Sequence, residues 1–385
     1  MNIDTVKGFK DFLGEEAEKR EEIRKILVKN FRKYGFEPAE TPVIEYREFV
    51  KGNNTNDEAV SDIFKLTDKG ERELALRYEF TFQLKRLMIG KKLPFKRYSI
   101  GPVFRDEPVT GNRLRQFTQC DIDVVGATIK DEAEVLSVVR RVLSELGIKF
   151  IIYINNRKLL NEILFKENIE KMDWEKVIKE VDKMDKLPED EIYNNLRSYG
   201  AQNVLELFKQ PESFFEKYEA YAEIAELKKY CKFYGVEVSF LPSLARGLSY
   251  YNGNVFEVKS DIKETITAGG SFMFNDIQST GLSFGLERLT ILAKSFTLNR
   301  KVLVLSINQD EKSIKIIETL RDNGSDCLFF NGKISKGLDY ANAKKIDFVI
   351  FVGDEEVEKG IVKLKNMETG EESLVKLEEV VKKLK

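Results

Sequence analysis

The chain contains no histidine among its 385 residues. This absence excludes a Ser-His-Asp triad, imidazole metal ligands and acid–base catalysis by imidazole, because each of them needs that side chain. Any chemistry must therefore use carboxylates, arginine, lysine, tyrosine, backbone groups, the substrate's own groups or a metal held by oxygen atoms.

Cysteine is scarce, and long apolar runs are missing. The three cysteines, Cys120, Cys231 and Cys327, are scattered and form no CxxC pair, which argues against a disulfide framework or a zinc site and fits a reducing cytosol. The first residues lack the apolar core of a signal peptide, and no apolar run is long enough to cross a membrane. We therefore expect a cytoplasmic protein that does not contact a membrane.

The composition otherwise fits a globular protein of more than one domain. Hydrophobic residues make up 42% and charged residues 33% of the chain. Its length is too great for one compact core, so two or three domains are expected. The net charge of −2 gives no support for a nucleic-acid partner, which would need a local basic surface.

The centre of the candidate chemistry is a predicted hairpin over residues 95–126. Two segments with alternating side chains flank a polar loop at 106–114, where Pro and Gly mark a turn. Strand side chains alternate between two faces, so one face of the second strand is largely apolar and the other suits the floor of a cleft. The first face holds Thr118, Cys120, Ile122 and Val124, and the second holds Arg115, Phe117, Gln119, Asp121 and Asp123.

Fixed cations surround the predicted loop. Arg105, Arg113 and Arg115 could hold an anionic ligand through bidentate hydrogen bonds. The hairpin alone is equally consistent with a solvated face that carries surface ion pairs.

Three later segments could bring further groups to a ligand. Glu79 and Thr81 sit at the junction between a predicted strand and a predicted helix over 81–90, although Thr81 could simply cap that helix. Arg246 comes just before a predicted strand that carries a tyrosine pair. Gly285 marks a passage from strand to helix, where helix amides and an arginine could bind phosphate together. An ordinary sheet crossed by a buried helix would explain the last two segments equally well.

The pattern of predicted elements divides the chain. Residues 156–235 show helical periodicity without strands, whereas the C-terminal part alternates strands and helices and predicts a small α/β domain. We therefore predict an α+β fold with an antiparallel sheet flanked by helices. The expected parts are 1–155 with 236–297, then 156–235, and 298–385.

The order of the motifs resembles the class II aminoacyl-tRNA synthetases, and specifically the histidyl-tRNA synthetase family of the archaeal and eukaryotic type. The resemblance rests on FRDE, GNRLRQF and QCDIDVVG, followed by ARGLSYYNG, AGG and GLSFGLERL. It implies a catalytic core over 1–155 and 236–297, a helical insertion and a C-terminal anticodon-binding domain. Pro42, in ETPVIEYREF, is similar to the family's motif 1, which implies a homodimer.

The resemblance also implies an activity. The family activates L-histidine with ATP to histidyl-adenylate and pyrophosphate, and then transfers histidine to tRNA(His). Mg²⁺ is expected as a cofactor beside ATP; its ligands stay unassigned, with Glu287 as one candidate. Alignment and charge neutralisation by arginine suffice for such a step, so no protein imidazole is needed.

Roles for individual residues follow from the matching motif positions. Arg246 and Arg105 are the implied catalytic cations. The implied ATP-binding residues are Arg105 on the α-phosphate, Glu107 and Phe117 on adenine, and Arg113 and Arg288 on the distal phosphates. The implied histidine-binding residues are Glu79, Thr81 and Gln119 at the ammonium group, Asp123 and Tyr251 at the imidazole, and Phe80, Arg105, Arg246 and Tyr250 beside them.

Three positions depart from the family pattern. Ser249 replaces an acid in the RGLDYY motif, Ser271-Phe272-Met273 replaces the end of GGRYD, and Thr118 precedes the glutamine of motif 2. These departures leave two alternatives open. One is the synthetase-like regulatory subunit of ATP phosphoribosyltransferase, which is a binding module. The other is a pseudo-synthetase that senses uncharged tRNA, although the chain has no kinase signature of the kind that usually accompanies it.

Overall fold

The computed structural model describes residues 3–51, 62–111, 113–184, 187–245, 250–262, 264–295 and 300–384. The chain divides into two compact units, Met1–Phe296 and Thr297–Lys385. No helix in these described ranges is long and apolar enough to span a bilayer.

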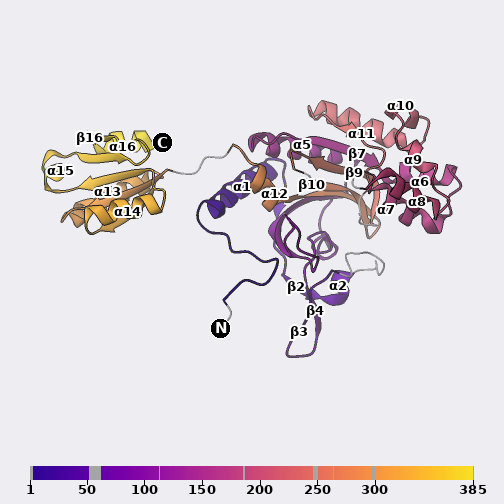
Figure 1. Cartoon of the computed structure of the whole chain (residues 1–385), viewed down its shortest axis with the longest axis horizontal. Helices are drawn as coiled ribbons and strands as arrows, with labels where there is room; N and C mark the ends of the chain where they lie inside the picture. The colour runs from indigo at the N-terminus through magenta and orange to yellow at the C-terminus, as the bar shows by residue number, and fades with distance from the viewer. Residues whose placement is uncertain are drawn as a thin grey trace. The chain divides into compact units, whose positions relative to one another are not determined.

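An eight-stranded sheet forms the centre of the first unit (Figure 1). Its six inner strands are antiparallel, and one short parallel strand lies at each edge. The predicted hairpin is confirmed, because its two strands pair along their whole length. In spatial order the strands are β1 (Glu37–Pro38), β5 (Phe95–Phe104), β6 (Gln116–Val125), β11 (Ile277–Gly285), β10 (Thr267–Phe274), β9 (Tyr251–Lys259), β7 (Ile151–Asn156) and β8 (Ser239–Phe240).

Helices cover one side of this sheet, and a small second sheet lies toward the other side (Figure 1). The helix α5 (Ile129–Glu145) begins with a capping box, in which the Thr128 amide donates to the Asp131 carboxylate at 2.8 Å. Its apolar stripe packs into the main core with Cys120, Ile122 and Val124 of β6. The other helices of this layer are α1 (Gly14–Lys33), α11 (Tyr221–Phe233) and α12 (Leu286–Leu292).

The small sheet has the strand order β2, β4, β3. The chain then reaches β5 through residues 77–94, where the predicted helix over 81–90 was too long. Only α4 (Leu84–Leu87) forms there, and Gly90 then turns the chain with a φ of 71°. The remaining elements of this region are β2 (Ile44–Tyr46), α2 (Arg47–Lys51), β3 (Lys65–Thr67) and β4 (Glu73–Leu76).

The segment between β7 and β8 contains helices and no strand among its described residues, as the sequence predicts. Its apolar side chains belong to the same core cluster as the central sheet, so it packs as an extension of that core. Before α11 its elements are α6 (Arg157–Lys166), η1 (Lys171–Asp173), α7 (Trp174–Val181), α8 (Glu189–Arg197), α9 (Val204–Leu207) and α10 (Glu212–Phe215).

The second unit is an α/β domain around a five-stranded mixed sheet of order β13, β12, β14, β15, β16. The first three strands are parallel and the last two antiparallel, so the predicted α/β architecture is confirmed. The sequence did not predict α15. The elements are β12 (Lys301–Ser306), α13 (Asp310–Asp322), β13 (Asp326–Asn331), α14 (Ile334–Ala343), β14 (Phe348–Val352), α15 (Asp354–Lys359), β15 (Val362–Asn366), β16 (Glu372–Val375) and α16 (Leu377–Leu384).

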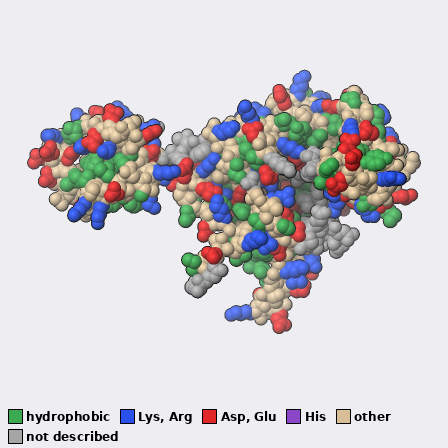
Figure 2. All heavy atoms as spheres, in the orientation of Figure 1, with side chains coloured by type: hydrophobic (Ala, Val, Ile, Leu, Met, Phe, Trp, Pro, Cys, Tyr) green, Lys and Arg blue, Asp and Glu red, His purple; other side chains and the backbone are tan. Residues whose placement is uncertain are grey.

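The surface carries charges of both signs. In the view of Figure 2, acidic and basic side chains are interspersed on both units, in agreement with the small net charge. This face therefore presents no large patch of one sign.

Candidate functional site

Three polar side chains form a row along β6, on the side of the sheet away from the main core. We call Gln119, Asp121 and Asp123 the acid row. Gln119, Asp121 and Asp123 alternate with the core residues of the strand, and they are 9%, 4% and 3% exposed. The neighbouring strand β11 makes room for this row. Gly281 lies opposite Asp123, and a Cβ atom there would come 2.1 Å from Asp123 Oδ1. Any side chain at position 281 would therefore displace this carboxylate.

Arg97 supports the row from β5. Its side chain is fully buried, and its Nη2 lies 2.6 Å from Asp123 Oδ2 and donates to the Phe80 carbonyl at 3.0 Å. Burial raises the pKa of Asp123 to about 7, against the opposing effect of Arg97. The sequence analysis missed Arg97. A hairpin symmetric about its loop places residue 97 opposite residue 123, so the register was the signal that could have found it.

Glu79 adds a second buried carboxylate. It is 4% exposed, and burial raises its pKa to about 8, with Arg105 opposing the shift and the nearby Asp121 and Asp123 adding to it. Its Oε1 has no hydrogen-bond partner in the described structure, and the Tyr250 hydroxyl lies 3.5 Å from its Oε2. A buried acceptor left open in this way is costly unless a ligand satisfies it.

Two predicted tyrosines stand near this carboxylate. The rings of Tyr250 and Tyr251 are 4.8 Å apart, and Phe272 packs edge-on against Tyr250 at 5.8 Å. Gly270 leaves space for them, because a Cβ atom there would lie 2.9 Å from the Tyr251 ring. Burial, and then the charge of Glu79, raises the pKa of Tyr250 well above its usual value, so this hydroxyl stays protonated.

Arg105 lies just beyond the end of β5, next to the acid row. Its guanidinium carbon is 4.3 Å from the Tyr78 ring centroid and 5.0 Å from that of Phe117. Its Nε is buried without a hydrogen-bond partner among the described residues. Aromatic rings therefore hold this cation in place while leaving a donor for an anionic ligand.

The remaining cations of the hairpin differ in their freedom. Arg113 is 61% exposed and lies 3.9 Å from the Glu107 carboxylate. Arg115, by contrast, donates to the Glu107 carbonyl at 3.0 Å and lies 3.3 Å from Asp106. On α12, Arg288 donates to the Thr265 carbonyl. The ATP roles of Glu107, Arg113, Phe117 and Arg288 stay predictions.

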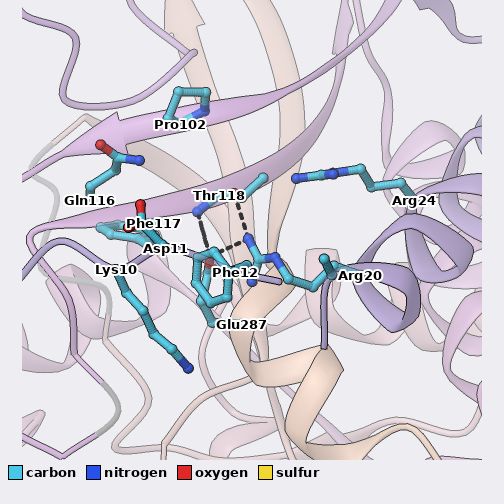
Figure 3. Close-up of a pocket in the computed structure, with 11 residues that line it drawn as sticks. Lys10, Asp11, Phe12, Arg20, Arg24, Pro102, Gln116, Phe117, Thr118 and Glu287 are labelled. Atoms are coloured by element: carbon cyan, nitrogen blue, oxygen red, sulfur yellow. Dashed lines mark hydrogen bonds and ion pairs between the residues drawn. The ribbon is translucent and has the colours of Figure 1, made fainter. Parts of the chain in front are cut away.

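A cavity of about 370 Å³ opens beside α1 at the first residues of β6, and Phe117 and Thr118 are among its lining residues (Figure 3). Arg20 and Arg24 point from α1 toward Thr118, and Arg20 Nη2 donates to Thr118 Oγ1 at 3.1 Å. Glu287 accepts from Arg20 at 2.8 Å and from the Thr118 amide with both oxygens at 3.1 Å. These bonds hold Glu287 away from the acid row and make it a poor candidate for a metal ligand.

The departures from the family pattern separate in space. Ser271 points to the helix side, where its hydroxyl donates to the buried Glu132 of α5. Phe272 is buried beside the tyrosine pair, and Met273 is 46% exposed. Arg246 and Ser249 lie outside the described residues.

The arrangement has a clear chemical use. Buried acceptors of Glu79, Gln119 and Asp121 can take up a cationic group, while Arg105 offers a fixed positive charge beside them. A substrate with an ammonium group close to a carboxylate or phosphate would satisfy both. An α-amino acid that is being phosphorylated on its carboxylate has this charge pattern.

Comparisons with known proteins agree with this interpretation. The family model described as histidyl-tRNA synthetase matches residues 8–289, and the anticodon binding domain matches residues 301–385. A histidine–tRNA ligase 2 of Shouchella clausii is 34% identical over 96% of this chain and 97% of its own length. A histidine–tRNA ligase 1 of Bacillus anthracis is 32% identical over 98% of both chains.

Solved structures share the fold. A histidyl-tRNA synthetase from Nostoc sp. PCC 7120 superposes with a TM-score of 0.87 at 24% identity, over 100% of this chain and 99% of that one. The predicted class II synthetase fold is therefore confirmed. The curated relatives named above are bacterial and give no support to the archaeal or eukaryotic subtype expected from the motifs. The family model matches residues 8–289, and a curated relative is 34% identical over 96% of this chain. The chain therefore belongs to the histidyl-tRNA synthetase family.

Proposed function

We propose that this chain is an ATP-dependent histidine–tRNA ligase. A carboxylate oxygen of L-histidine attacks the α-phosphorus of ATP, and pyrophosphate leaves with the electrons of the broken P–O bond. A terminal hydroxyl of tRNA(His) then attacks the carbonyl carbon of the adenylate, its proton passes to the phosphate of the adenylate, and AMP leaves. Family membership supports this reaction, and the buried acid row beside Arg105 is the structural observation that carries it.

We assign the histidine site to the acid row and its neighbours. Glu79, Thr81 and Gln119 bind the ammonium group, and Asp123 and Tyr251 bind the imidazole, with Phe80 and Tyr250 beside them. The burial of both carboxylates supports this assignment, because ionic hydrogen bonds gain strength where water is excluded. Asp123 is held in place by Arg97, so an imidazole N–H would meet an acceptor of fixed position.

We assign the nucleotide to the Arg105 side of the hairpin. Arg105 binds the α-phosphate, Phe117 and Glu107 contact adenine, and Arg113 and Arg288 hold the distal phosphates. The exposure of Arg113 supports its role, since it can reach for the pyrophosphate without breaking a strong pair. Arg288 has to exchange the Thr265 carbonyl for phosphate oxygens.

Arg246 is proposed as the second catalytic cation, on the carboxylate and α-phosphate. Mg²⁺ is proposed to arrive with the phosphates of ATP. In the described part of the chain, no group of three His, Cys, Asp or Glu side chains is placed to hold a metal, and Glu287 is already bonded to Arg20. We therefore derive no step through a metal bound by the protein itself.

The partners follow the family. We propose that residues 298–385 bind the anticodon, that the helical segment 156–235 contacts the acceptor arm and that the chain acts as a cytoplasmic homodimer. The side chains of Val43, Ile44 and Tyr46, just after Pro42, are 37%, 50% and 54% exposed and give the dimer an apolar surface to bury. Sedimentation of the intact chain tests the dimer, and a monomer at all concentrations would contradict it.

The test of the function is pyrophosphate exchange that depends on L-histidine. The wild-type chain is expected to exchange label between pyrophosphate and ATP only with histidine present. Arg246→Ala should keep detectable ATP binding while its exchange rate collapses. An unchanged rate would remove Arg246 from the mechanism.

The alternative regulatory subunit remains a second candidate. A structure named as an ATP phosphoribosyltransferase regulatory subunit/histidyl-tRNA synthetase from Bacillus halodurans C has a TM-score of 0.74 at 19% identity, over 91% of this chain and 98% of that one. A folded chain that binds histidine yet catalyses no exchange would favour this candidate.

A further inference from the structure

The acid row and the neighbouring Glu79 contain four buried acceptor oxygens that lack hydrogen-bond partners among the described residues. One of them, Asp123 Oδ2, lies 2.6 Å from Arg97 in an ion pair. The other three are Glu79 Oε1, Gln119 Oε1 and Asp121 Oδ1, and each side chain is at least nine-tenths buried. Buried polar atoms in folded proteins are normally paired, so three open acceptors in one place indicate a ligand that brings donors. An α-ammonium group has three N–H donors and a positive charge.

Asp121 is central to this group by its position in the sheet. It lies two residues from Gln119 and two from Asp123 on the same face of β6, with Ser283 of β11 and Ser99 of β5 opposite it. Ser283 Oγ accepts from Gln119 Nε2 at 2.9 Å. This bond turns Gln119 Oε1 away from Ser283 and leaves it open for a ligand.

We propose that Asp121 is a third ammonium-binding residue, and that its Oδ1 accepts one N–H of the substrate's α-ammonium group beside Glu79 and Gln119. The inference rests on the proposed function and adds a residue to its histidine site. Neither the motif positions nor the comparisons assign a role to Asp121.

The electrostatics of the neighbourhood support an ionised Asp121. Burial raises its pKa to about 6, with Arg97, a hydrogen bond from Ser283 and Arg105 limiting the shift. Burial also raises the pKa of Glu79 to about 8 and that of Asp123 to about 7. A cationic group beside these carboxylates favours their ionised forms.

Thr81, which is also expected at the ammonium group, makes a hydrogen bond with another side chain of the site. Burial raises the pKa of Tyr250, and a hydrogen bond with the Thr81 side chain opposes this shift, which places the two hydroxyls against each other. Thr81 can thus position Tyr250, while Asp121 supplies an acceptor. Arg97, in turn, pairs with Asp123 at 2.6 Å, and Asp121 has no comparably close ion pair among the described residues.

The experiment compares two ligands on Asp121→Asn, which keeps the size of the side chain and removes its charge. Calorimetry measures the binding of L-histidine and of imidazolepropionate, which carries the same imidazole and carboxylate but no ammonium group. Losing a hydrogen bond between charged groups should weaken histidine binding by roughly 10- to 100-fold. Imidazolepropionate should bind the variant and the wild-type chain equally.

Two further proteins complete the test. Asp261→Asn is the matched control, because this aspartate is 65% exposed and lies 3.8 Å from Lys294 at the surface; it should bind both ligands as the wild type does. Asp121→Ser provides a smaller neutral side chain, with the same expected selectivity, if the amide disturbs folding.

The outcomes separate this inference from the proposed function. A selective loss of histidine affinity supports Asp121 as an ammonium ligand. Equal losses for both ligands, or no loss in either neutral variant, would overturn it while wild-type exchange leaves the ligase function intact. A wild-type chain that neither binds histidine nor catalyses exchange would remove the proposed function and this inference together.

Discussion

The central sheet buries carboxylates on both of its sides. The two sides differ in whether the protein supplies a hydrogen-bond donor to every carboxylate oxygen. On the helix side, Glu132 accepts from Asn254 Nδ2 at 2.7 Å and from the Ser271 hydroxyl, so each of its oxygens has a partner. On the other side, Glu79 and Asp121 each keep one oxygen without a partner among the described residues. Burial raises the pKa of Glu132 to about 7 and that of Glu79 to about 8.

The comparison teaches that a shifted pKa does not by itself identify a site. Glu132 and Glu79 are similarly buried and similarly shifted, yet only one of them has an acceptor left to offer. Asn254 passes the network of Glu132 on to Asn156, which donates to it at 2.9 Å. We interpret the helix side as a structural network and the Glu79 side as a binding site that its substrate completes.

The largest effect should come from breaking the buried ion pair between Arg97 and Asp123. Arg97→Leu leaves Asp123 buried without its partner, which we expect to lower the free energy of unfolding by about 3–5 kcal/mol. Urea unfolding of the full chain measures this change in the free energy of unfolding. The double variant Arg97→Leu/Asp123→Leu should recover most of the loss, and a single variant as stable as the wild type would show that the pair is dispensable.

Removing the fixed cation should affect catalysis more than folding. Arg105→Ala removes the charge that we propose to lie beside the reacting phosphate, and we expect the exchange rate to fall by about 10²–10³-fold. Initial rates at saturating histidine and ATP measure the change. Arg321→Ala, an exposed arginine of the second unit, is the control. Arg105 would lose its assigned role if both variants kept the wild-type rate.

Removing a hydrogen-bond donor on the helix side should affect folding stability more than catalysis. Ser271→Ala leaves one oxygen of Glu132 unpaired, at an expected stability cost of about 1–3 kcal/mol. Because Ser271 points away from the acid row, the Michaelis constants for histidine and ATP should not change. A raised constant for histidine with unchanged stability would show that the two sides are not independent.

The last comparison concerns the pH dependence of stability. Because the pKa of Glu79 is raised from 4.5 to about 8, the folded chain holds a proton that the unfolded chain releases between these values. Glu79 therefore lowers the free energy of unfolding as the pH rises through this window. Without histidine, Glu79→Gln should have a flatter stability curve than the wild type and be the more stable of the two near pH 8.

Thermal unfolding of the wild type and the variants at a series of pH values measures these curves. Glu206→Gln, a glutamate of the first unit that is 70% exposed, should follow the wild-type curve. If Glu79→Gln also follows the wild-type curve, ionisation of Glu79 does not contribute to the pH dependence of the free energy of unfolding.

Much of the fold was open to prediction because it depends on local patterns. The alternation over 95–126 predicted the hairpin, and helical periodicity predicted the helices within 156–235. The helix predicted over 81–90 was too long, because propensity at its ends yields to the turn that carries the chain from β4 to β5. Local sequence could not show this tertiary demand.

The site was predictable only in part, for a physical reason. Gln119 and Asp123 were placed on one face by the strand period, and Asp121 was placed there with them but received no role. Ser283, which orients Gln119, comes from a strand 164 positions away. Thr118 stood on the core face as predicted, but its partner Arg20 is 98 positions away, so its polar role was invisible.

One measurement tests the central claim, that the side with unpartnered acceptors is the histidine site. Histidine-dependent pyrophosphate exchange is measured for Glu79→Gln and Ser271→Ala side by side, with thermal unfolding as the check that both are folded. The account predicts that Glu79→Gln loses exchange through a raised Michaelis constant for histidine, while Ser271→Ala exchanges as the wild type does. Normal exchange by Glu79→Gln together with impaired exchange by Ser271→Ala would contradict it.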